Sequence, residues 1–283
     1  MISYLDVLDS VGFFCRCGLE VGVIGASCDG RLIPYVFVGS KTGRQIIVTG
    51  GIHAREHLST YLVIKQIEYA ANNTVPLTGV YFIPIINPDG NMLICKGIGC
   101  IKNCDKKLLH NILMCKDRAL YKANARGVDL NVNFDAEWGS GKFNSRVVGT
   151  ENYIGEYPFS ENESRALRDF TLLVNPSATV SYHCKGQEIY YEFSRGGNLP
   201  PENRDFKIAQ YLNQKLNYKI LPDDGTSAGG YKDWCIQKLK IPSFTIELAS
   251  DDLQHPINDY SLASEDINNN LDLPLRLLTA LKV

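Results

Sequence analysis

The chain has 283 residues and nearly balanced charge, with 29 lysines and arginines against 31 aspartates and glutamates and a net charge of −2 at pH 7. No basic excess is available to neutralise phosphates, so the composition argues against nucleic acid as an obligate partner. No stretch approaches the roughly 20 apolar residues that span a bilayer, and residues 1–20 lack the basic and apolar regions of a secretion signal, so we expect a cytoplasmic protein without a membrane partner.

The hydrophobic pattern predicts strands that alternate with helices. Short apolar runs rich in β-branched residues predict strands at 32–38, 45–49, 80–86, 178–182, 189–193 and 243–248. Longer helical patterns predict helices over 59–71, 160–174, 203–216 and 263–281. Several strand runs are apolar throughout, as expected of strands that helices cover on both faces. Because no linker or repeat divides the chain, we expect residues 1–283 to form one α/β domain, a three-layer α/β/α arrangement around a mixed, mostly parallel sheet.

The first polar motif follows the predicted strand at 45–49, in the segment QIIVTGGIHAREHLSTYLVI. His53 and Glu56 are three residues apart, so in a helical turn both side chains can reach one ion. Imidazole and carboxylate are ordinary zinc ligands, and a catalytic site usually takes three protein ligands. A helix N-terminus capped by Glu56 explains the same letters. His57 crowds the same turn, so the spacing leaves the identity of the ligating histidine open.

Further polar residues stand at or near the ends of other predicted strands. His183 ends one apolar run, and Glu247 lies inside another, where an unpaired buried acid is costly. The stretch NARGVDLNVNF packs Arg126, Asp129 and Asn131 into a short segment, and IINPDGN adds another polar strand end. In open α/β sheets, ligands bind beyond the carboxyl ends of the strands. We therefore expect these side chains to gather at one edge of the sheet.

The ordered set HxxE, NPDG, GVDLNxN, a distant strand-end histidine and FTIEL resembles the carboxypeptidase A-like zinc peptidases over nearly the whole chain. The resemblance implies an open mixed sheet with one zinc ion in a funnel at the strand ends. His53, Glu56 and His183 match the family's zinc ligands. Glu247 matches the general base and acid that activates the attacking water. Arg126 resembles the arginine that polarises the scissile carbonyl and stabilises the oxyanion.

The resemblance also implies residues that support the centre and hold the substrate. Asp129 resembles the acid that orients the first ligating histidine, as metal-bound imidazoles generally require. Asn131 matches an asparagine that helps to hold the terminal carboxylate of the substrate. Arg55, which lies between the first two ligands, is a further substrate-binding candidate.

The chain departs from the family pattern at three positions. Val132 stands where an arginine clamps the terminal carboxylate, and valine cannot form that bidentate pair. The family's mobile tyrosine aligns with Gly225, and Tyr231 lies nearby without an evident role. Lys232 aligns with the floor of the side-chain pocket, where it would attract a carboxylate, although a solvent-exposed helix lysine is the plainer interpretation.

Two phrases, YKANARGVDLN and SAGGYKDW, resemble the bacterial γ-D-glutamyl-meso-diaminopimelate peptidases. The resulting hypothesis is zinc-dependent hydrolysis of the γ-D-Glu–diaminopimelate amide in murein stem peptides, with a small acidic peptide as partner. A carboxypeptidase or deacylase that acts on acidic residues remains an alternative. A zinc-containing binding protein without turnover is a second alternative, which Glu247 and Arg126 disfavour.

Nine cysteines in a chain without an evident secretion signal favour reduced thiols over a disulfide framework. Four of them, Cys95, Cys100, Cys104 and Cys115, cluster at residues 95–120, where we expect a surface insertion. Their spacing lacks the paired CxxC knuckles of a zinc ribbon. We therefore expect free thiols there rather than a structural metal. A nucleophilic pair of His183 and Cys184 is disfavoured, because zinc explains Glu56 and Glu247 better.

Overall fold

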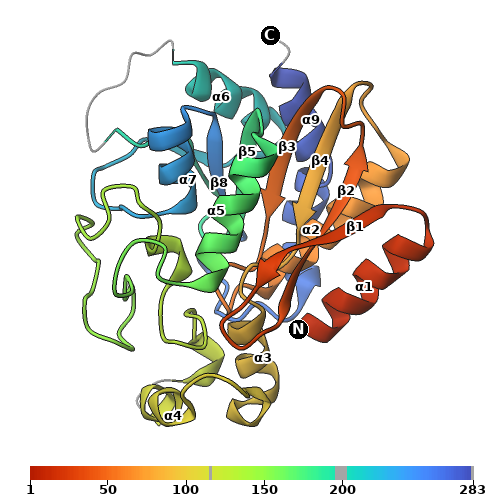
Figure 1. Cartoon of the computed structure of the whole chain (residues 1–283). Helices are drawn as coiled ribbons and strands as arrows, with labels where there is room; N and C mark the ends of the chain where they lie inside the picture. Colours follow the sequence, from red (N-terminus) through yellow and green to blue (C-terminus); the bar gives the residue numbers. More distant parts are fainter. Residues whose placement is uncertain (115–116, 195–202, 282–283) are drawn as a thin grey trace.

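The computed structural model describes residues 1–114, 117–194 and 203–281, and its centre is an eight-stranded sheet (Figure 1). Across the sheet the strands run in the order β1-β2-β4-β3-β5-β8-β6-β7. Neighbours pair in parallel at β4–β3, β3–β5, β5–β8 and β6–β7, and antiparallel at the other three contacts. The strands are β1 (Glu20–Ala26), β2 (Leu32–Gly39), β3 (Arg44–Thr49), β4 (Thr78–Ile83), β5 (Ala178–Cys184), β6 (Glu188–Tyr190), β7 (Lys219–Leu221) and β8 (Ser243–Leu248).

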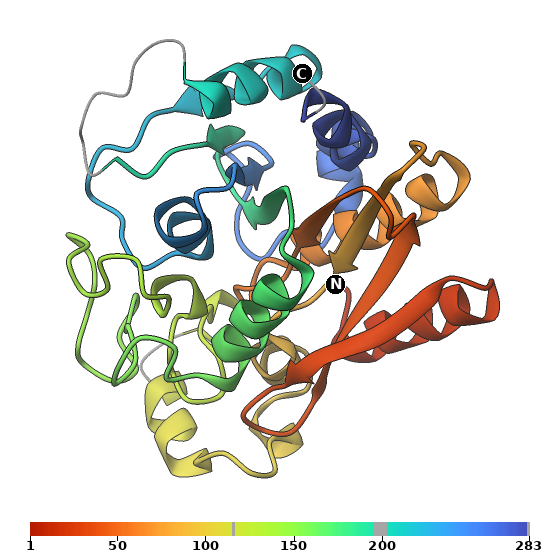
Figure 2. The same ribbon diagram turned by 45° about the horizontal axis from the view of Figure 1, so that its top comes forward.

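Helices cover both faces of this sheet (Figures 1 and 2). One apolar cluster joins the sheet to α1, α2, α6 and α9, and the other joins it to α5 and α7. The expected α/β fold with a mixed, mostly parallel sheet is thus confirmed. Within the described ranges, no helix combines the length and the apolar character needed to cross a bilayer. The helices are α1 (Tyr4–Arg16), α2 (His57–Asn72), α3 (Pro88–Lys96), α4 (Lys106–Met114), α5 (Asn162–Val174), α6 (Arg204–Leu216), α7 (Tyr231–Trp234), α8 (Ser264–Asn270) and α9 (Leu273–Ala280).

The central strands are rich in apolar residues because both of their faces are buried. In β3, Ile46 and Val48 pack into the cluster under α2, while Ile47 packs into the cluster under α5. This alternation follows from the two-residue period of a strand. Both faces of the central strands are therefore covered by helices. Polar side chains on these strands can reach solvent only where the strands end.

Some elements differ from the sequence prediction. The helix predicted over 263–281 is divided into η5 (Tyr260–Ala263), α8 and α9, with Pro274 in the first turn of α9. Proline has no amide hydrogen, so it suits a helix start and interrupts a longer helix. The helix α1 and the strands β1 and β7 were not predicted. The first strand is nowhere fully buried, so its hydrophobic pattern is weak.

The predicted insertion at residues 95–120 contains the end of α3, the short helices η1 (Ile98–Cys100) and η2 (Arg118–Leu120), and α4. Its apolar side chains form a small cluster with Ala54 and with Tyr121, Ala123 and Ala125, which precede the GVDLN segment. Cys115 lies outside the described residues. This part of the chain extends away from the sheet (Figure 1).

Leu62 tests the core beneath α2. The side chain is fully buried between α2 and the sheet, so Leu62→Ala should lower the free energy of unfolding by about 2–5 kcal/mol. Leu173→Ala is the matched control, because Leu173 is 81% exposed on α5 and should change stability by at most about 0.5 kcal/mol. Urea denaturation measures both; equal effects would contradict the assigned core.

Candidate metal centre

The structure brings His53, Glu56 and His183 together, with their candidate ligand atoms all within 4.8 Å of one another. The Nδ1 atom of His53 lies 2.7 Å from Oε1 of Glu56. The Nδ1 atom of His183 lies 3.2 Å from Oε2 of Glu56 and 3.3 Å from Nδ1 of His53. Two imidazole nitrogens and one carboxylate that face a common point fit the ligand set of a catalytic zinc ion, with a position left open.

The ends of parallel strands position these side chains. Glu56 stands at the first boundary of α2 but makes no capping hydrogen bond with its side chain, so the capping interpretation is wrong. His53 and Glu56 lie on the turn between β3 and α2 rather than on a helix, which corrects the expected local structure. Gly51 permits this turn: its φ is 59°, and an added Cβ would lie 2.4 Å from Oγ1 of Thr60.

The NPDG motif fixes the turn from behind. The side-chain amide of Asn87 donates to the carbonyls of Ile52 at 3.2 Å and Ala123 at 3.1 Å. The backbone nitrogen of Ala54 donates to the carbonyl of Lys122 at 3.0 Å. Asn87 therefore joins the metal-binding turn to the segment that contains GVDLN, and its role here is positional.

A chain of buried charges extends from the centre. Nε2 of His53 lies 3.1 Å from Oδ1 of Asp129, and Oδ2 of Asp129 lies 2.7 Å from Nζ of Lys122. Burial disfavours the imidazolium, but Glu56 and Asp129 outweigh it and raise the pKa of His53 to about 9. Burial would raise the pKa of Asp129, but Lys122 and His53 hold it well below its usual range. The centre therefore favours positive charge where the zinc ligands converge.

Lys122 is the residue that the sequence interpretation missed. It precedes Asp129 by seven positions, inside the same phrase YKANARGVDLN. Its ammonium group also donates to the side-chain oxygen of Asn152 at 2.6 Å. Composition alone offered no reason to prefer Lys122 over Arg126, the other cation of that phrase.

Glu247 lies next to the centre on β8. It is directly opposite His183 in the parallel register of β5 and β8, and opposite Glu188 on β6. Burial, then the negative charges of Glu56 and Glu188, raise the pKa of Glu247 well above its usual range, although His53 and Lys122 oppose the shift. A partly buried carboxyl with a raised pKa is suited to general acid–base chemistry.

Asn131 and Lys232 line the same cavity of about 270 Å³ as Glu247. The Lys232 ammonium lies 2.6 Å from Oδ1 of Asp233 and donates to the carbonyl of Glu192 at 2.6 Å. Lys232 is thus a mostly buried cavity residue, which argues against the solvent-exposed interpretation. Tyr190 also lines this cavity.

Three other residues considered from the sequence, His57, Arg55 and Tyr231, do not line the cavity of Glu247. His57 contacts the carbonyl of Ile2 and the Asn91 amide through Nδ1, each at 3.1 Å, which resolves the choice of histidine in favour of His53. Arg55 donates to the carbonyl of Leu120 at 3.1 Å. Tyr231 is fully buried with its hydroxyl 2.8 Å from Oγ1 of Thr171, so it is held in the core.

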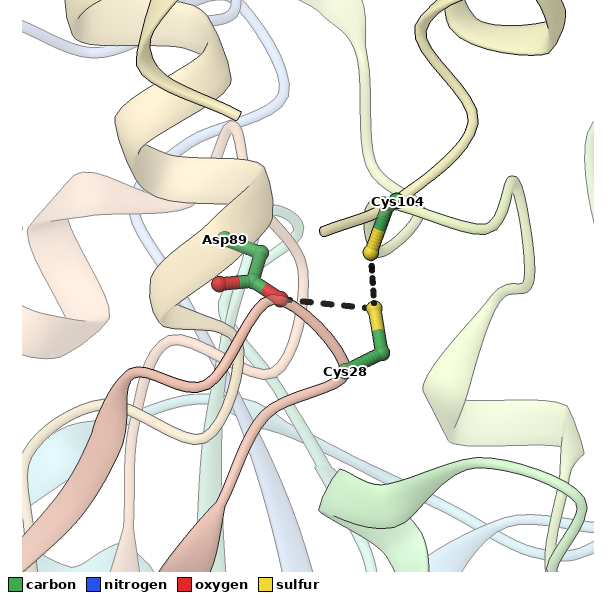
Figure 3. Close-up of side chains that lie close together, drawn as sticks. All are labelled: Cys28, Asp89 and Cys104. Carbon is green, nitrogen blue, oxygen red and sulfur yellow. Dashed lines mark hydrogen bonds between the residues drawn. The ribbon is translucent and has the colours of Figure 1, made fainter. Parts of the chain in front are cut away.

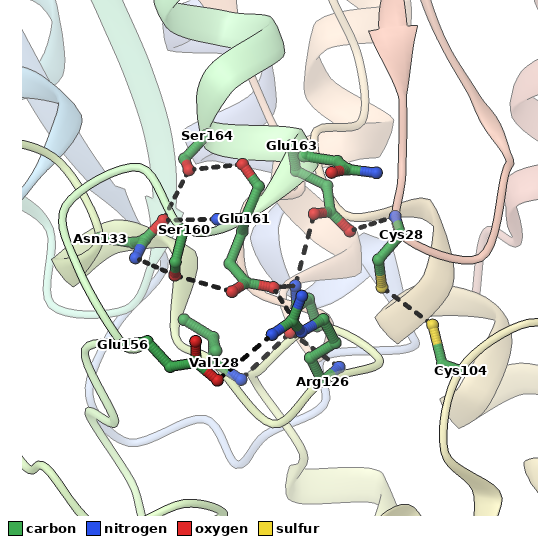
Figure 4. A network of polar contacts seen from close by, with 12 residues as sticks. Cys28, Cys104, Arg126, Val128, Asn133, Glu156, Ser160, Glu161, Glu163 and Ser164 are labelled. Atoms are coloured by element: carbon green, nitrogen blue, oxygen red, sulfur yellow. Dashed lines mark hydrogen bonds and ion pairs between the residues drawn. The ribbon is translucent and has the colours of Figure 1, made fainter.

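The structure does not bring Arg126 to the centre. Its guanidinium lies 3.7 Å from Glu156 and 3.6 Å from Glu161 (Figure 4). It lines a separate cavity of about 470 Å³ that shares no residue with the cavity of Glu247. This corrects the expectation that Arg126 contacts the reacting carbonyl. The cation of YKANARGVDLN that lies beside the zinc-ligand cluster is Lys122, which pairs with Asp129. The chain turns at Asn124 and so directs Arg126 away.

Comparison with known proteins agrees with this geometry. Residues 16–270 match the sequence model of the zinc carboxypeptidases. The chain belongs to the zinc carboxypeptidase family. It is 29% identical over 256 residues to "Gamma-D-glutamyl-L-diamino acid endopeptidase 1" of Lysinibacillus sphaericus, an alignment that covers 84% of this chain and 62% of that relative. The chain thus spans less than two thirds of that relative's length.

Solved structures show the same fold. Carboxypeptidase A from Helicoverpa armigera superposes with a TM-score of 0.78 at 19% identity, covering 99% of this chain and 73% of that one. The murein-tripeptide amidase MpaA from Escherichia coli O157 superposes with a TM-score of 0.60 at 20% identity, covering 90% of this chain and 91% of that one. At identities of 19% and 20%, these matches show a shared fold and nothing further about this member of the zinc carboxypeptidase family.

Asp129→Asn tests the charge chain behind His53. Asparagine keeps the shape of the side chain but removes the negative charge that orients the imidazole and balances Lys122. Zinc affinity should fall about 10- to 100-fold, measured by competition with a chromophoric chelator. Asp169→Asn is the control, since Asp169 is exposed on α5, and it should leave affinity unchanged. Equal affinity in the two variants would contradict the assigned role.

Proposed function

We propose that the protein is a zinc-dependent peptidase that cleaves the amide between γ-D-glutamate and a diamino acid, meso-diaminopimelate, in murein stem peptides. The observation that carries the proposal is the cavity beside Glu247, which is lined by charged side chains of both signs. The family membership supports the metal chemistry, and the cavity supports the choice of substrate.

The residues present suit amide hydrolysis. A zinc ion held by His53, Glu56 and His183 would supply a Lewis acid that polarises the carbonyl and activates water. Glu247 takes the proton of the attacking water and passes it to the leaving amine, a transfer that its raised pKa favours. Lys122 takes the electrostatic role first expected of Arg126, because its positive charge acts on both Glu56 and Glu247.

The cavity carries more negative than positive charge. Besides Lys232 and Glu247 it is lined by four acidic residues, Glu192, Asp223, Asp224 and Asp233. An ammonium group of the substrate would find carboxylates there, and a carboxylate would find Lys232. The far end of meso-diaminopimelate carries both groups on one carbon. This balance favours a diamino acid over the C-terminal glutamate or aspartate considered as an alternative.

Two further observations support this substrate. The printed name of the Lysinibacillus relative contains a γ-D-glutamyl group and a diamino acid. In this chain Val132 replaces the residue type that would clamp an ordinary terminal carboxylate through a bidentate pair. Both favour a specialised peptide over the C-terminus of a protein.

A matched set of three tripeptides tests the substrate. L-Ala-γ-D-Glu should be joined to meso-diaminopimelate, L-lysine or L-alanine, and the zinc-loaded protein assayed for release of the last residue. We expect kcat/KM to be highest for diaminopimelate and at least about tenfold lower for alanine, a loss of about 1.4 kcal/mol in binding the transition state. Lys232→Met should reduce the preference for diaminopimelate over lysine. Release of C-terminal glutamate from ordinary peptides, without cleavage of any murein tripeptide, would contradict the proposal.

Glu247→Gln separates an enzyme from a zinc-containing binding protein. The amide keeps the size of the side chain but cannot accept the proton, so kcat should fall about 10²- to 10⁴-fold. Zinc content, measured by mass spectrometry, should not change, since Glu247 is outside the ligand cluster. Glu265→Gln, an exposed change on α8, is the control. Unchanged turnover in Glu247→Gln would remove this carboxyl from the chemistry.

A further inference from the structure

A second group of metal-binding side chains lies far from the catalytic cluster in the sequence. Cys28 follows β1, Asp89 is in the first turn of α3, and Cys104 precedes α4. The sulfur of Cys28 lies 3.1 Å from that of Cys104 and 3.4 Å from Oδ2 of Asp89 (Figure 3). Among the clustered cysteines that the structure describes, Cys104 is the one that contacts Cys28.

We propose that Cys28, Asp89 and Cys104 bind a second divalent metal ion of the zinc class. Their ligand atoms all lie within 4.8 Å of one another. In a tetrahedral zinc site with Zn–S bonds of about 2.3 Å, two sulfurs lie about 3.7 Å apart. The observed sulfur distance thus requires each side chain to move by only a few tenths of an ångström. The site goes beyond the proposed peptidase activity and shares no residue with it.

The carboxylate of Asp89 is already held in place. Its Oδ1 accepts from the hydroxyl of Ser27 and from the guanidinium of Arg31, each at 2.7 Å. Its Oδ2 faces the thiol of Cys28 and accepts from the backbone nitrogen of Asp29 at 2.9 Å. Carboxylates that bind metals are commonly fixed by such outer hydrogen bonds. Asp89 is therefore oriented with one oxygen toward the two sulfurs.

Charged groups of both signs surround the two sulfurs, and Arg126 lines the same cavity. Arg31 is paired with both Asp29 and Asp89. The carboxyl of Glu163, whose pKa is raised to about 8 by burial and by Asp89, accepts from the backbone nitrogen of Cys28 at 3.4 Å (Figure 4). Negative charge disfavours a free thiolate, which is the form that oxidation to a disulfide requires. A bound divalent ion reverses this, because it stabilises coordinated thiolates. These surroundings favour a metal over a disulfide.

The site is accessible and has a structural consequence. Cys28 and Cys104 line the cavity of about 470 Å³, which gives an ion an entry path and a water molecule a fourth position. The carboxylate of Asp29 accepts from the backbone nitrogens of Lys102 and Asn103. A metal ion would therefore reinforce an existing connection and fasten the segment at residues 95–120 to the turn between β1 and β2.

Cobalt substitution tests this site independently of catalysis. The catalytic cluster contains no sulfur ligand, so thiolate-to-Co²⁺ charge-transfer absorption in the near ultraviolet reports on the second site alone. The reduced full chain should be stripped with a chelator and titrated with Co²⁺, and its zinc content measured after reloading. We expect the charge-transfer band and two zinc ions per chain. The readout does not depend on peptidase activity, so it remains valid if the proposed substrate fails.

Matched variants assign the band to the proposed ligands. Cys104→Ser should abolish the band and leave one zinc ion per chain, whereas Cys17→Ser, at an exposed cysteine, should change neither. Asp89→Asn should weaken cobalt binding at the second site at least tenfold. Retention of the catalytic zinc and an unchanged circular dichroism spectrum would show that each variant is folded.

Two outcomes would overturn the proposal. In the first, the reduced wild-type chain binds one zinc ion and shows no thiolate band. In the second, the protein isolated without reductant is two hydrogen masses lighter than the reduced form, and a peptide map links Cys28 to Cys104. That result would show that the pair forms a disulfide instead of a metal site.

Discussion

The ion pair between Lys122 and Asp129 is the interaction on which the catalytic centre depends. Asp129 is almost fully buried, and an unpaired carboxylate in that position would cost several kcal/mol. Lys122 supplies the compensating charge, which lets Asp129 remain ionised and hold the imidazole of His53. Lys122 thus orients His53 through Asp129 and, through His53, influences how His53 and Glu56 converge. Carboxylates outnumber cations around this centre, and this excess of negative charge acts on Glu247 in the neighbouring cavity.

That imbalance explains why one carboxyl of the centre differs from the others. Glu56 and Asp129 have strongly lowered pKa values because His53 and Lys122 outweigh the effect of burial. Little positive charge is left for Glu247, so burial and the neighbouring carboxylates raise its pKa. The same fold thereby keeps two carboxylates ionised as ligand and support, and leaves the third ready to exchange protons. Neighbouring acids whose pKa values are shifted in opposite directions are the usual basis for assigning acid–base roles.

The sequence predicted the central strands well and the edges poorly, for physical reasons. β8 was predicted at its observed bounds because five of its six residues are buried and apolar side chains alternate along it, whereas β1 is nowhere fully buried and β7 has three residues. The grouping of His53, Glu56 and His183 could be predicted because their motifs stand at or after the ends of neighbouring parallel strands. The choice between Arg126 and Lys122 could not, since both are cations in one loop, and only the path of the chain past Asn124 decides which of them faces Asp129.

The same reasoning limits what single residues say about specificity and about metals. Lys232 alone predicts a carboxylate on the substrate, but Asp223 and Asp224, which line the same cavity, add a place for an ammonium group. Cys104 alone predicts a free thiol, but Asp89 and Cys28 come to it from distant segments and change its surroundings. In each case the decisive property is the sum of the charges that the fold gathers around one point. A chain whose net charge is only −2 can therefore hold sites where carboxylates are locally concentrated, and such sites favour a positively charged partner, whether an ammonium group or a metal ion.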